Sequence, residues 1–337
     1  MSGAGSTFRV GVVGTGSLGF HHARILRDIP DLEMRGVYEV RPERAQEVSR
    51  ELEVDAHGSL EALLDNVDAA VVAVPTLEHE AVAVTALERG VHVLIEKPMA
   101  PDLEAADRIL SAAEKTGARV QIGHVERFNP AILAAEAYLE RPLFIESHRL
   151  APFVPRSTDV AVVLDLMIHD VDLVCGLVGD SIRDISAAGL PVLTPNVDIA
   201  NARLTFKGGA VANLTASRVS MEKKRKLRIF QRSGYLSLNL ADGTGEFLRL
   251  KEDLPSLSRD PGFMASIPEG GIAEMIERIP LQGERVEPLR SELESFRDTC
   301  LGRREPAVSG LDGREALAVT LSIEERIRSH VAHSRPT

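Results

Sequence analysis

One segment constrains the fold of this chain more than any other. Gly14-Thr15-Gly16-Ser17-Leu18-Gly19 follows an apolar strand, 8–13, and precedes a helical stretch, 20–27. In a strand-turn-helix of this kind, the glycines permit a tight turn, backbone approach to a pyrophosphate and close packing of helix on strand. The free amides at the start of the helix attract an anion. The sequence therefore predicts a dinucleotide-binding unit.

An acid closes the second predicted strand, 34–38. Glu39 lies twenty positions after Gly19, where a carboxylate accepts hydrogen bonds from an adenosine ribose. Its charge repels a 2′-phosphate, so NAD is favoured over NADP. Arg41 and Arg44 leave NADP open, because a neighbouring guanidinium can bind that phosphate.

Strands and helices alternate up to residue 122, which predicts a doubly wound parallel sheet, a Rossmann domain, over residues 1–124. Ligands of such sheets bind at the carboxyl ends of the strands. The run 91–98 delivers an acid and a base to that edge. The cofactor candidates that follow the glycine-rich segment and Glu39 at this edge are Arg41, Pro75, Thr76, His79, Glu96, Lys97 and His124.

From residue 125 to 337 strands dominate. Six are predicted, at 182–188, 199–206, 210–217, 227–231, 235–240 and 246–250, after one at 143–150, and 253–271 is predicted to be a loop. This pattern indicates an α+β domain with a large, mostly antiparallel sheet that is open on one face. We expect the open face to bind a second subunit, giving a homodimer or homotetramer, and the C-terminal helix to pack back on the first domain.

An apolar helix over 160–177 carries acids and an imidazole. Asp165 and His169 are four residues apart and Asp172 is three beyond, so the three side chains share one face, whereas Asp170 points elsewhere. A carboxylate beside an imidazole raises its basicity, as a general base requires. The alternative is an amphipathic helix with a core histidine. For a dehydrogenase, His169 and Lys97 are the candidates to accept a hydroxyl proton.

The charge balance limits the partners. Lys and Arg number 39 against 50 Asp and Glu, which argues against binding to nucleic acid or anionic membranes. Neither a signal peptide nor a membrane-spanning run is recognised, so a cytoplasmic protein is expected. Cys175 and Cys300 suggest free thiols, and no metal-binding pattern is found. An anionic ligand would need local cations, and those available are Arg127, Arg156, Arg218 and the run 222–226, which includes Lys224.

Together these motifs resemble the glucose-fructose oxidoreductase/inositol dehydrogenase (Gfo/Idh/MocA) family of nicotinamide-dependent enzymes. The resemblance rests on the glycine-rich fingerprint, Val74-Pro75-Thr76 with His79, Glu96-Lys97-Pro98 and the Asp165-x-x-x-His169 helix, and it covers nearly the whole chain. It implies that Lys97, Asp165 and His169 line the site. It also implies that the histidine or the lysine handles the proton.

Segments 123–130, 165–172 and 218–226 further resemble the UDP-N-acetylglucosamine 3-dehydrogenases of that family. This resemblance implies oxidation of the sugar's C3 hydroxyl to a ketone, which an aminotransferase can aminate for lipid A or other surface glycans. The substrate-binding candidates are Arg127, Arg156, Asp165, His169 and Lys224. Two alternatives stay open: oxidation of a free polyol or simple sugar, and a sensor that binds NAD without chemistry.

Overall fold

The computed structural model describes residues 8–154, 160–251, 272–284 and 286–333. The chain divides into two compact units. Unit 1 is Met1–Phe128 with Val286–Leu321, and unit 2 is Asn129–Arg285 with Ser322–Thr337. The domain limits expected from the sequence, 1–124 and 125–337, place residues 125–128 and 286–321 in the second domain, whereas the structure groups both stretches with unit 1. Helical periodicity reveals an apolar face, but it does not reveal which core that face joins.

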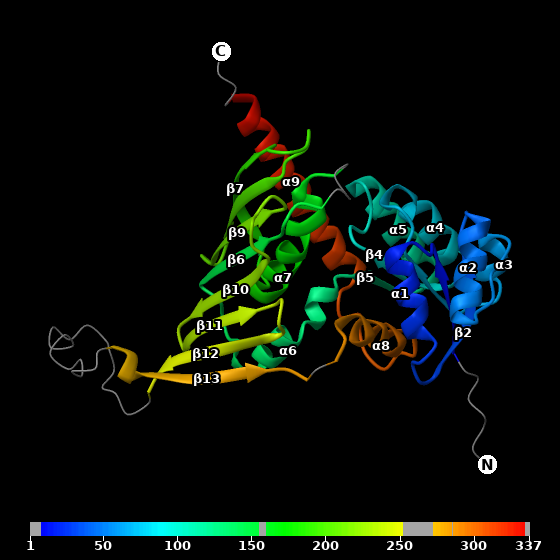
Figure 1. Cartoon of the computed structure of the whole chain (residues 1–337), viewed down its shortest axis with the longest axis horizontal. Helices are drawn as coiled ribbons and strands as arrows, with labels where there is room; N and C mark the ends of the chain where they lie inside the picture. The colour runs from blue at the N-terminus through cyan, green and yellow to red at the C-terminus, as the bar shows by residue number, and fades with distance from the viewer. Residues whose placement is uncertain (1–7, 155–159, 252–271, 285, 334–337) are drawn as a thin grey trace. The chain divides into compact units, whose positions relative to one another are not determined.

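Unit 1 is built on a parallel sheet with strand order β2-β1-β3-β4-β5, with helices on both faces (Figure 1). The predicted doubly wound sheet is confirmed. The strands are β1 (Phe8–Val13), β2 (Leu32–Tyr38), β3 (Ala69–Val72), β4 (His92–Glu96) and β5 (Val120–Gly123). The helices are α1 (Ser17–Leu26), α2 (Pro42–Leu52), α3 (Leu60–Leu64), η1 (Thr76–Glu78), α4 (His79–Leu87), α5 (Leu103–Thr116), η2 (Val125–Phe128), α8 (Pro288–Cys300) and the first part of α9 (Gly310–His333).

The C-terminal segment completes the core of unit 1. On one face of the sheet, Leu26 of α1 and Val48 of α2 pack in the same buried cluster as Leu293 and Phe296 of α8. On the other face, Gly11 of β1 packs directly against Leu63 of α3. Helices from both ends of the chain therefore bury the same sheet.

The strand order reverses between β1 and β3, and open α/β sheets bind ligands at such a switch point. Gly14 lies there with φ +84°, and a Cβ on it would come within 2.8 Å of the Ala73 carbonyl oxygen. A Cβ on Gly19 would come within 1.9 Å of the Gly14 carbonyl oxygen. Only glycine fits at these two positions, because α1 and β3 approach the turn so closely.

Unit 2 contains an eight-stranded sheet with order β13-β12-β11-β10-β6-β9-β8-β7. Neighbouring strands are antiparallel except β6 and β9, which are parallel. The strands are β6 (Phe144–Leu150), β7 (Ile182–Leu190), β8 (Ile199–Phe206), β9 (Val211–Ser217), β10 (Lys224–Gln231), β11 (Gly234–Asn239), β12 (Thr244–Leu250) and β13 (Ile276–Gln282). The helical segments are α6 (Pro130–Ala135), η3 (Glu136–Tyr138), η4 (Val163–Met167), α7 (Ile168–Val178), η6 (Ile272–Met275) and the end of α9.

Two strand predictions need correction. Strand β13 was not predicted, because Pro280 interrupts its pattern; β13 lies at the edge of the sheet, where a proline is tolerated. Strand β10 begins at Lys224 rather than 227, since Lys224–Lys226 pair with His148–Leu150 of β6. The basic run is therefore partly strand. The predicted loop 253–271 lies outside the described residues.

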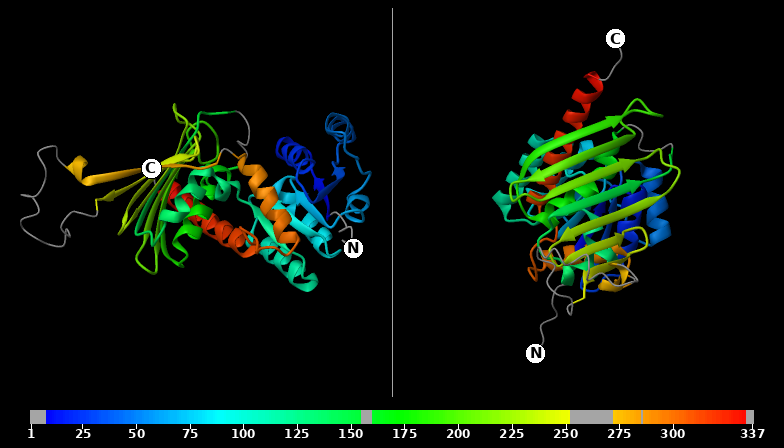
Figure 2. Two further views of the ribbon diagram at one scale, coloured as in Figure 1. Left: turned by 90° about the horizontal axis from the view of Figure 1, so that it is seen from below. Right: turned by 90° about the vertical axis from the view of Figure 1, so that its left-hand side faces the viewer.

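The two faces of this sheet differ. In β6, Ile145, Ser147 and Arg149 are buried, and the last two contact α7, whereas Phe144 and His148 are only half-buried on the opposite face. Figure 2 (right) shows this opposite face with no helix in front of it. The open-faced sheet is confirmed, and its use as a subunit interface stays a prediction.

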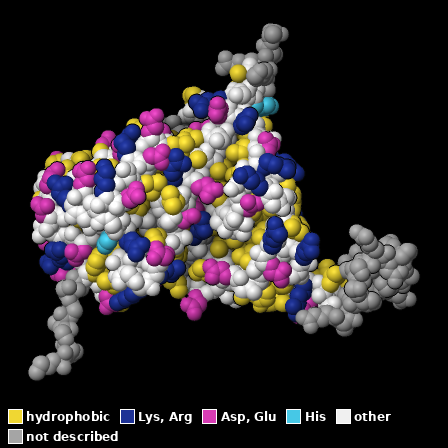
Figure 3. All heavy atoms as spheres, turned by 180° about the vertical axis from the view of Figure 1, so that it is seen from behind, with side chains coloured by type: hydrophobic (Ala, Val, Ile, Leu, Met, Phe, Trp, Pro, Cys, Tyr) yellow, Lys and Arg dark blue, Asp and Glu magenta, His cyan; other side chains and the backbone are white. Residues whose placement is uncertain are grey.

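On the face of the molecule that Figure 3 shows, Lys and Arg side chains alternate with Asp and Glu, and no broad region has one sign of charge. Among the described residues, every helix is too short or too polar to cross a membrane.

The geometry at Gly19 predicts an asymmetric response to alanine. Gly19→Ala should lower the free energy of unfolding by about 2 kcal/mol or more, because the new methyl group would overlap the Gly14 carbonyl. Gly16→Ala is the matched control. No heavy atom of the described chain lies within 4 Å of a Cβ there, so its loss should stay below about 1 kcal/mol. Urea unfolding measures both, and equal losses would contradict the packing described here.

Candidate active site

The glycine-rich turn forms a cradle at the switch point of unit 1. Helix α1 begins at Ser17, and among the described residues no side chain caps its first turn. Ser17 and Leu18 are exposed, and the space around Gly16 is open. Amides at a helix start with room in front of them suit a phosphate group. These residues fit the pyrophosphate of a dinucleotide.

Glu39 is fixed beside this cradle. One carboxylate oxygen accepts from the Thr15 N–H (2.9 Å), and the other accepts from Arg41 Nε (2.9 Å) and the Arg41 N–H (3.2 Å). Burial opposes ionisation, but these donors outweigh it and lower the pKa of Glu39 to about 2. A charged carboxylate thus lies next to the turn. Arg44 adds a further contact, since its Nε donates to the Thr15 carbonyl (2.9 Å).

His79 links the segments that follow β3 and β4. Its Nδ1 lies 2.9 Å from the Pro98 carbonyl oxygen and its Nε2 lies 3.0 Å from the Val74 carbonyl oxygen. Burial lowers the pKa of His79, although both carbonyls oppose this shift. The imidazole is only 1% exposed, whereas Pro75 is exposed and Thr76 half-buried. His79 therefore contacts the protein backbone on both sides and holds the two segments together.

Glu96 points into unit 1, while Lys97 is half-buried at the strand end. The Glu96 carboxylate lies 2.7 Å from Nε2 of His22 on α1, and it also accepts from the Lys97 N–H (3.2 Å). Burial opposes its charge, but His22 and Lys97 keep the pKa of Glu96 below its usual value. The Lys97–Pro98 bond is cis. His22 lies within the helical stretch 20–27 predicted from the sequence, but no sequence pattern indicates its contact with Glu96, since 74 positions separate the two residues.

His124 and Arg127 complete the unit 1 candidates. His124 follows β5 and is buried, and Arg127 is half-buried in η2. The cofactor candidates of this unit thus lie along one edge, at or directly after the carboxyl ends of β1, β2, β3, β4 and β5. This is the edge at which parallel sheets bind ligands.

In unit 2, Asp165 lies in the π-helical turn η4 and His169 lies in the first turn of α7, and both are half-buried. The regular helix expected over 160–177 is therefore interrupted. Sequence periodicity gives no signal for this turn, because the apolar pattern continues through it. Single π turns inside helices occur frequently at functional sites.

Helix α7 is fixed to the sheet by a buried ion pair. Asp170, next to His169, accepts from Arg149 Nε (2.7 Å) and Nη2 (3.1 Å), and from the Ser147 hydroxyl (2.9 Å). Both charged side chains are at most 4% exposed. This bidentate contact fixes both the direction of the Arg149 guanidinium and its distance from Asp170. It therefore orients the helix that carries His169.

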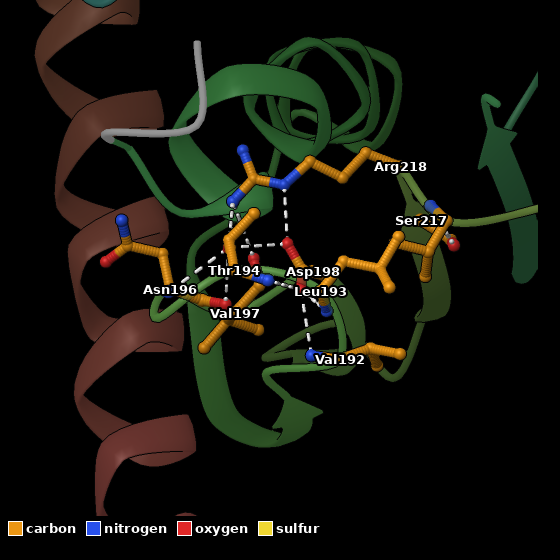
Figure 4. Close-up of polar contacts among 9 residues, drawn as sticks. Val192, Leu193, Thr194, Asn196, Val197, Asp198, Ser217 and Arg218 are labelled. Carbon is orange, nitrogen blue, oxygen red and sulfur yellow. Dashed lines mark hydrogen bonds and ion pairs between the residues drawn. The ribbon is translucent and has the colours of Figure 1, made fainter. Parts of the chain in front are cut away.

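A second buried ion pair holds the start of the π turn (Figure 4). The Asp198 carboxylate accepts from three successive amides, Val192 (2.8 Å), Leu193 (2.6 Å) and Thr194 (2.8 Å), and from Arg218 Nε (2.9 Å). Burial opposes ionisation, but the three amides and the Thr194 hydroxyl hold the pKa of Asp198 far below its usual range. The Val197 carbonyl next to it accepts from the Val162 N–H (2.9 Å), directly before η4.

The remaining predicted cations do not form one cluster. Arg218 was expected to be available to an anionic ligand, but it is buried on Asp198. Lys224 is exposed, and it lies on the face of the sheet opposite to α7, so the structure does not bring it together with Asp165 and His169. Arg156 lies outside the described residues.

Comparisons with known proteins agree with this architecture. Residues 8–124 match the oxidoreductase family with an NAD-binding Rossmann fold, and residues 133–237 match the GFO/IDH/MocA C-terminal domain. The chain belongs to the Gfo/Idh/MocA family of oxidoreductases. The family, fold class and enzyme class predicted from the sequence are confirmed.

Relatives of this Gfo/Idh/MocA protein include two kinds of dehydrogenase. The UDP-N-acetylglucosamine 3-dehydrogenase of Acidithiobacillus ferrooxidans is 38% identical over 322 residues, which is 95% of this chain and 97% of that one. A solved structure of that enzyme has a TM-score of 0.87 and covers 97% of this chain and 99% of its own. The myo-inositol 2-dehydrogenase of Thermotoga maritima is 26% identical, and the match covers 94% of this chain and 97% of that enzyme.

The buried position of Arg218 predicts that it stabilises the fold. Arg218→Ala would leave the Asp198 carboxylate without its cation, and we expect a loss of about 3 to 5 kcal/mol in the free energy of unfolding. Arg203→Ala, on the exposed side of β8, is the control and should change it by less than about 0.5 kcal/mol. Unchanged stability together with a raised KM for the sugar would instead return Arg218 to a substrate-binding role.

Proposed function

We propose that this protein is an NAD-dependent dehydrogenase that oxidises the C3 hydroxyl of UDP-N-acetylglucosamine to a ketone. The observation that carries the proposal is the 38% identity to a UDP-N-acetylglucosamine 3-dehydrogenase over 95% of the chain. This match spans both units. The inositol dehydrogenase that also covers nearly the whole chain matches it at 26%.

The preference for NAD over NADP is argued from Glu39. With a pKa of about 2, its carboxylate is charged at every physiological pH, and it would repel the additional phosphate of NADP. Arg41 could favour NADP instead, because its side chain is 63% exposed and its guanidinium could turn toward the additional phosphate. To do so it would have to give up its hydrogen bonds to Glu39, which favours NAD.

In the proposed reaction, the bound nicotinamide supplies the acceptor for the hydride that leaves C3 of the sugar. His169 removes the proton of the C3 hydroxyl, and Asp165 orients His169 and favours its charged form. Lys97 donates a hydrogen bond to the same oxygen and stabilises the negative charge that develops there. The cradle at Gly14–Gly19 holds the pyrophosphate, and Glu39 binds the adenosine ribose. The ketone product would be a substrate for an aminotransferase.

The decisive experiment incubates the protein with NAD or NADP and, separately, UDP-N-acetylglucosamine, UDP-glucose, myo-inositol and glucose. Hydroxylamine is added to trap a ketone. We expect reduced nicotinamide to appear with UDP-N-acetylglucosamine and NAD, together with the oxime that hydroxylamine forms from the 3-keto sugar with loss of water. Turnover of myo-inositol or glucose alone would favour the polyol or simple-sugar alternative. NAD binding without reduction by any of these substrates would favour the sensor.

Lys97 provides a test at the level of one residue. Lys97→Ala should lower kcat by about 100-fold or more, because the developing charge loses a donor, while the Kd for NAD stays nearly unchanged. Steady-state kinetics and calorimetry measure the two quantities. Lys115→Ala, at the exposed end of α5, is the control and should match the wild type. Wild-type turnover in Lys97→Ala would remove Lys97 from the reaction.

A further inference from the structure

The main chain around Lys97 is held on two sides. Its own N–H donates to the Glu96 carboxylate (3.2 Å), and the carbonyl of the next residue, Pro98, lies 2.9 Å from Nδ1 of His79. The backbone that carries the lysine is thereby restricted before and after the residue.

The position of Glu96 depends on His22. Nε2 of His22 lies 2.7 Å from Oε1 of Glu96, and Oε2 of the same carboxylate receives the Lys97 N–H. The His22 ring is fully buried, and the Glu96 side chain is 11% exposed. A Cβ on Gly123 would lie 3.3 Å from Oε2, so β5 also confines the carboxylate. One carboxylate thus connects helix α1 to the strand end.

The imidazole is the donor in this link. A carboxylate only accepts hydrogen bonds, so His22 contributes its Nε2–H to the contact. Nδ1 of His22 is buried and has no hydrogen-bond partner among the described residues. Nε2 is therefore the atom through which the ring holds Glu96, next to Lys97.

We infer that His22 is a positioning residue for Lys97: it holds Glu96, which holds the backbone of the lysine, and so it controls turnover without touching cofactor or sugar. This inference rests on the proposed function, in which Lys97 contacts the reacting oxygen. Helix α1 begins at the phosphate cradle, so the same helix supports the pyrophosphate and, through His22, the lysine.

Three variants of α1, with two of β4 in reserve, separate positioning from general stability. His22→Leu removes the donor and should lower kcat between about 10- and 100-fold, with less than about a twofold change in the KM for NAD. His22→Gln keeps an N–H donor near Nε2 and should recover most of that loss. His21→Leu, the exposed neighbour on α1, is the control and should match the wild type. If His22→Leu does not fold, Glu96→Ala and Glu96→Gln provide the same comparison.

A double-mutant cycle with Lys97→Ala decides the route of the effect. If His22 acts through Lys97, adding His22→Leu to Lys97→Ala should cost no further kcat. Additive losses, or an unchanged kcat in His22→Leu, would overturn the inference. Wild-type turnover in Lys97→Ala would instead overturn the catalytic assignment of the lysine, a result that is distinct from any outcome for His22.

Discussion

A carboxylate inside a protein needs hydrogen-bond donors, and this requirement ties together the segments that carry the candidate chemistry. Glu96 takes donors from α1 and from the strand end of Lys97. Asp170 takes them from β6, and Asp198 takes them from its own loop and from Arg218. In each case at least one of the donors comes from a different element than the carboxylate. Removing one partner would leave a buried charge unpaired, so each contact strongly favours a single arrangement.

The polar residues near the candidate site are of two kinds: some face the site and others face the protein interior. Glu39 and the glycine-rich turn face the cradle and are suited to bind a ligand. Glu96, His79, Asp170 and Asp198 face the interior and hold the residues that would do the chemistry. Specificity for a sugar would then depend on unit 2, whereas the cradle recognises only the cofactor. This division agrees with a family in which the Rossmann part is shared and the substrates differ.

Local patterns explain what could be predicted from the sequence. The glycine-rich turn, Glu39 and the strand that ends at Lys97 were recognised because each depends on neighbours within one βα unit. The contact between His22 and Glu96 and the ion pair of Arg218 depend on side chains brought together by the fold, and no spacing in the sequence indicates them. The π turn at Asp165 was missed because its apolar pattern is that of an ordinary helix.

Unit 1 consists of two stretches of chain that are far apart in the sequence, which affects the order in which it can fold during synthesis. Unit 2 is formed mainly by the continuous stretch 129–285, but the core of unit 1 requires Leu293 and Phe296, which the ribosome makes after all of that stretch. Domains generally fold as they emerge from the ribosome, with the N-terminal part first. Here the apolar surface of α1 stays uncovered while the middle of the chain is made. The part of the protein that is translated first is therefore among the last to be complete.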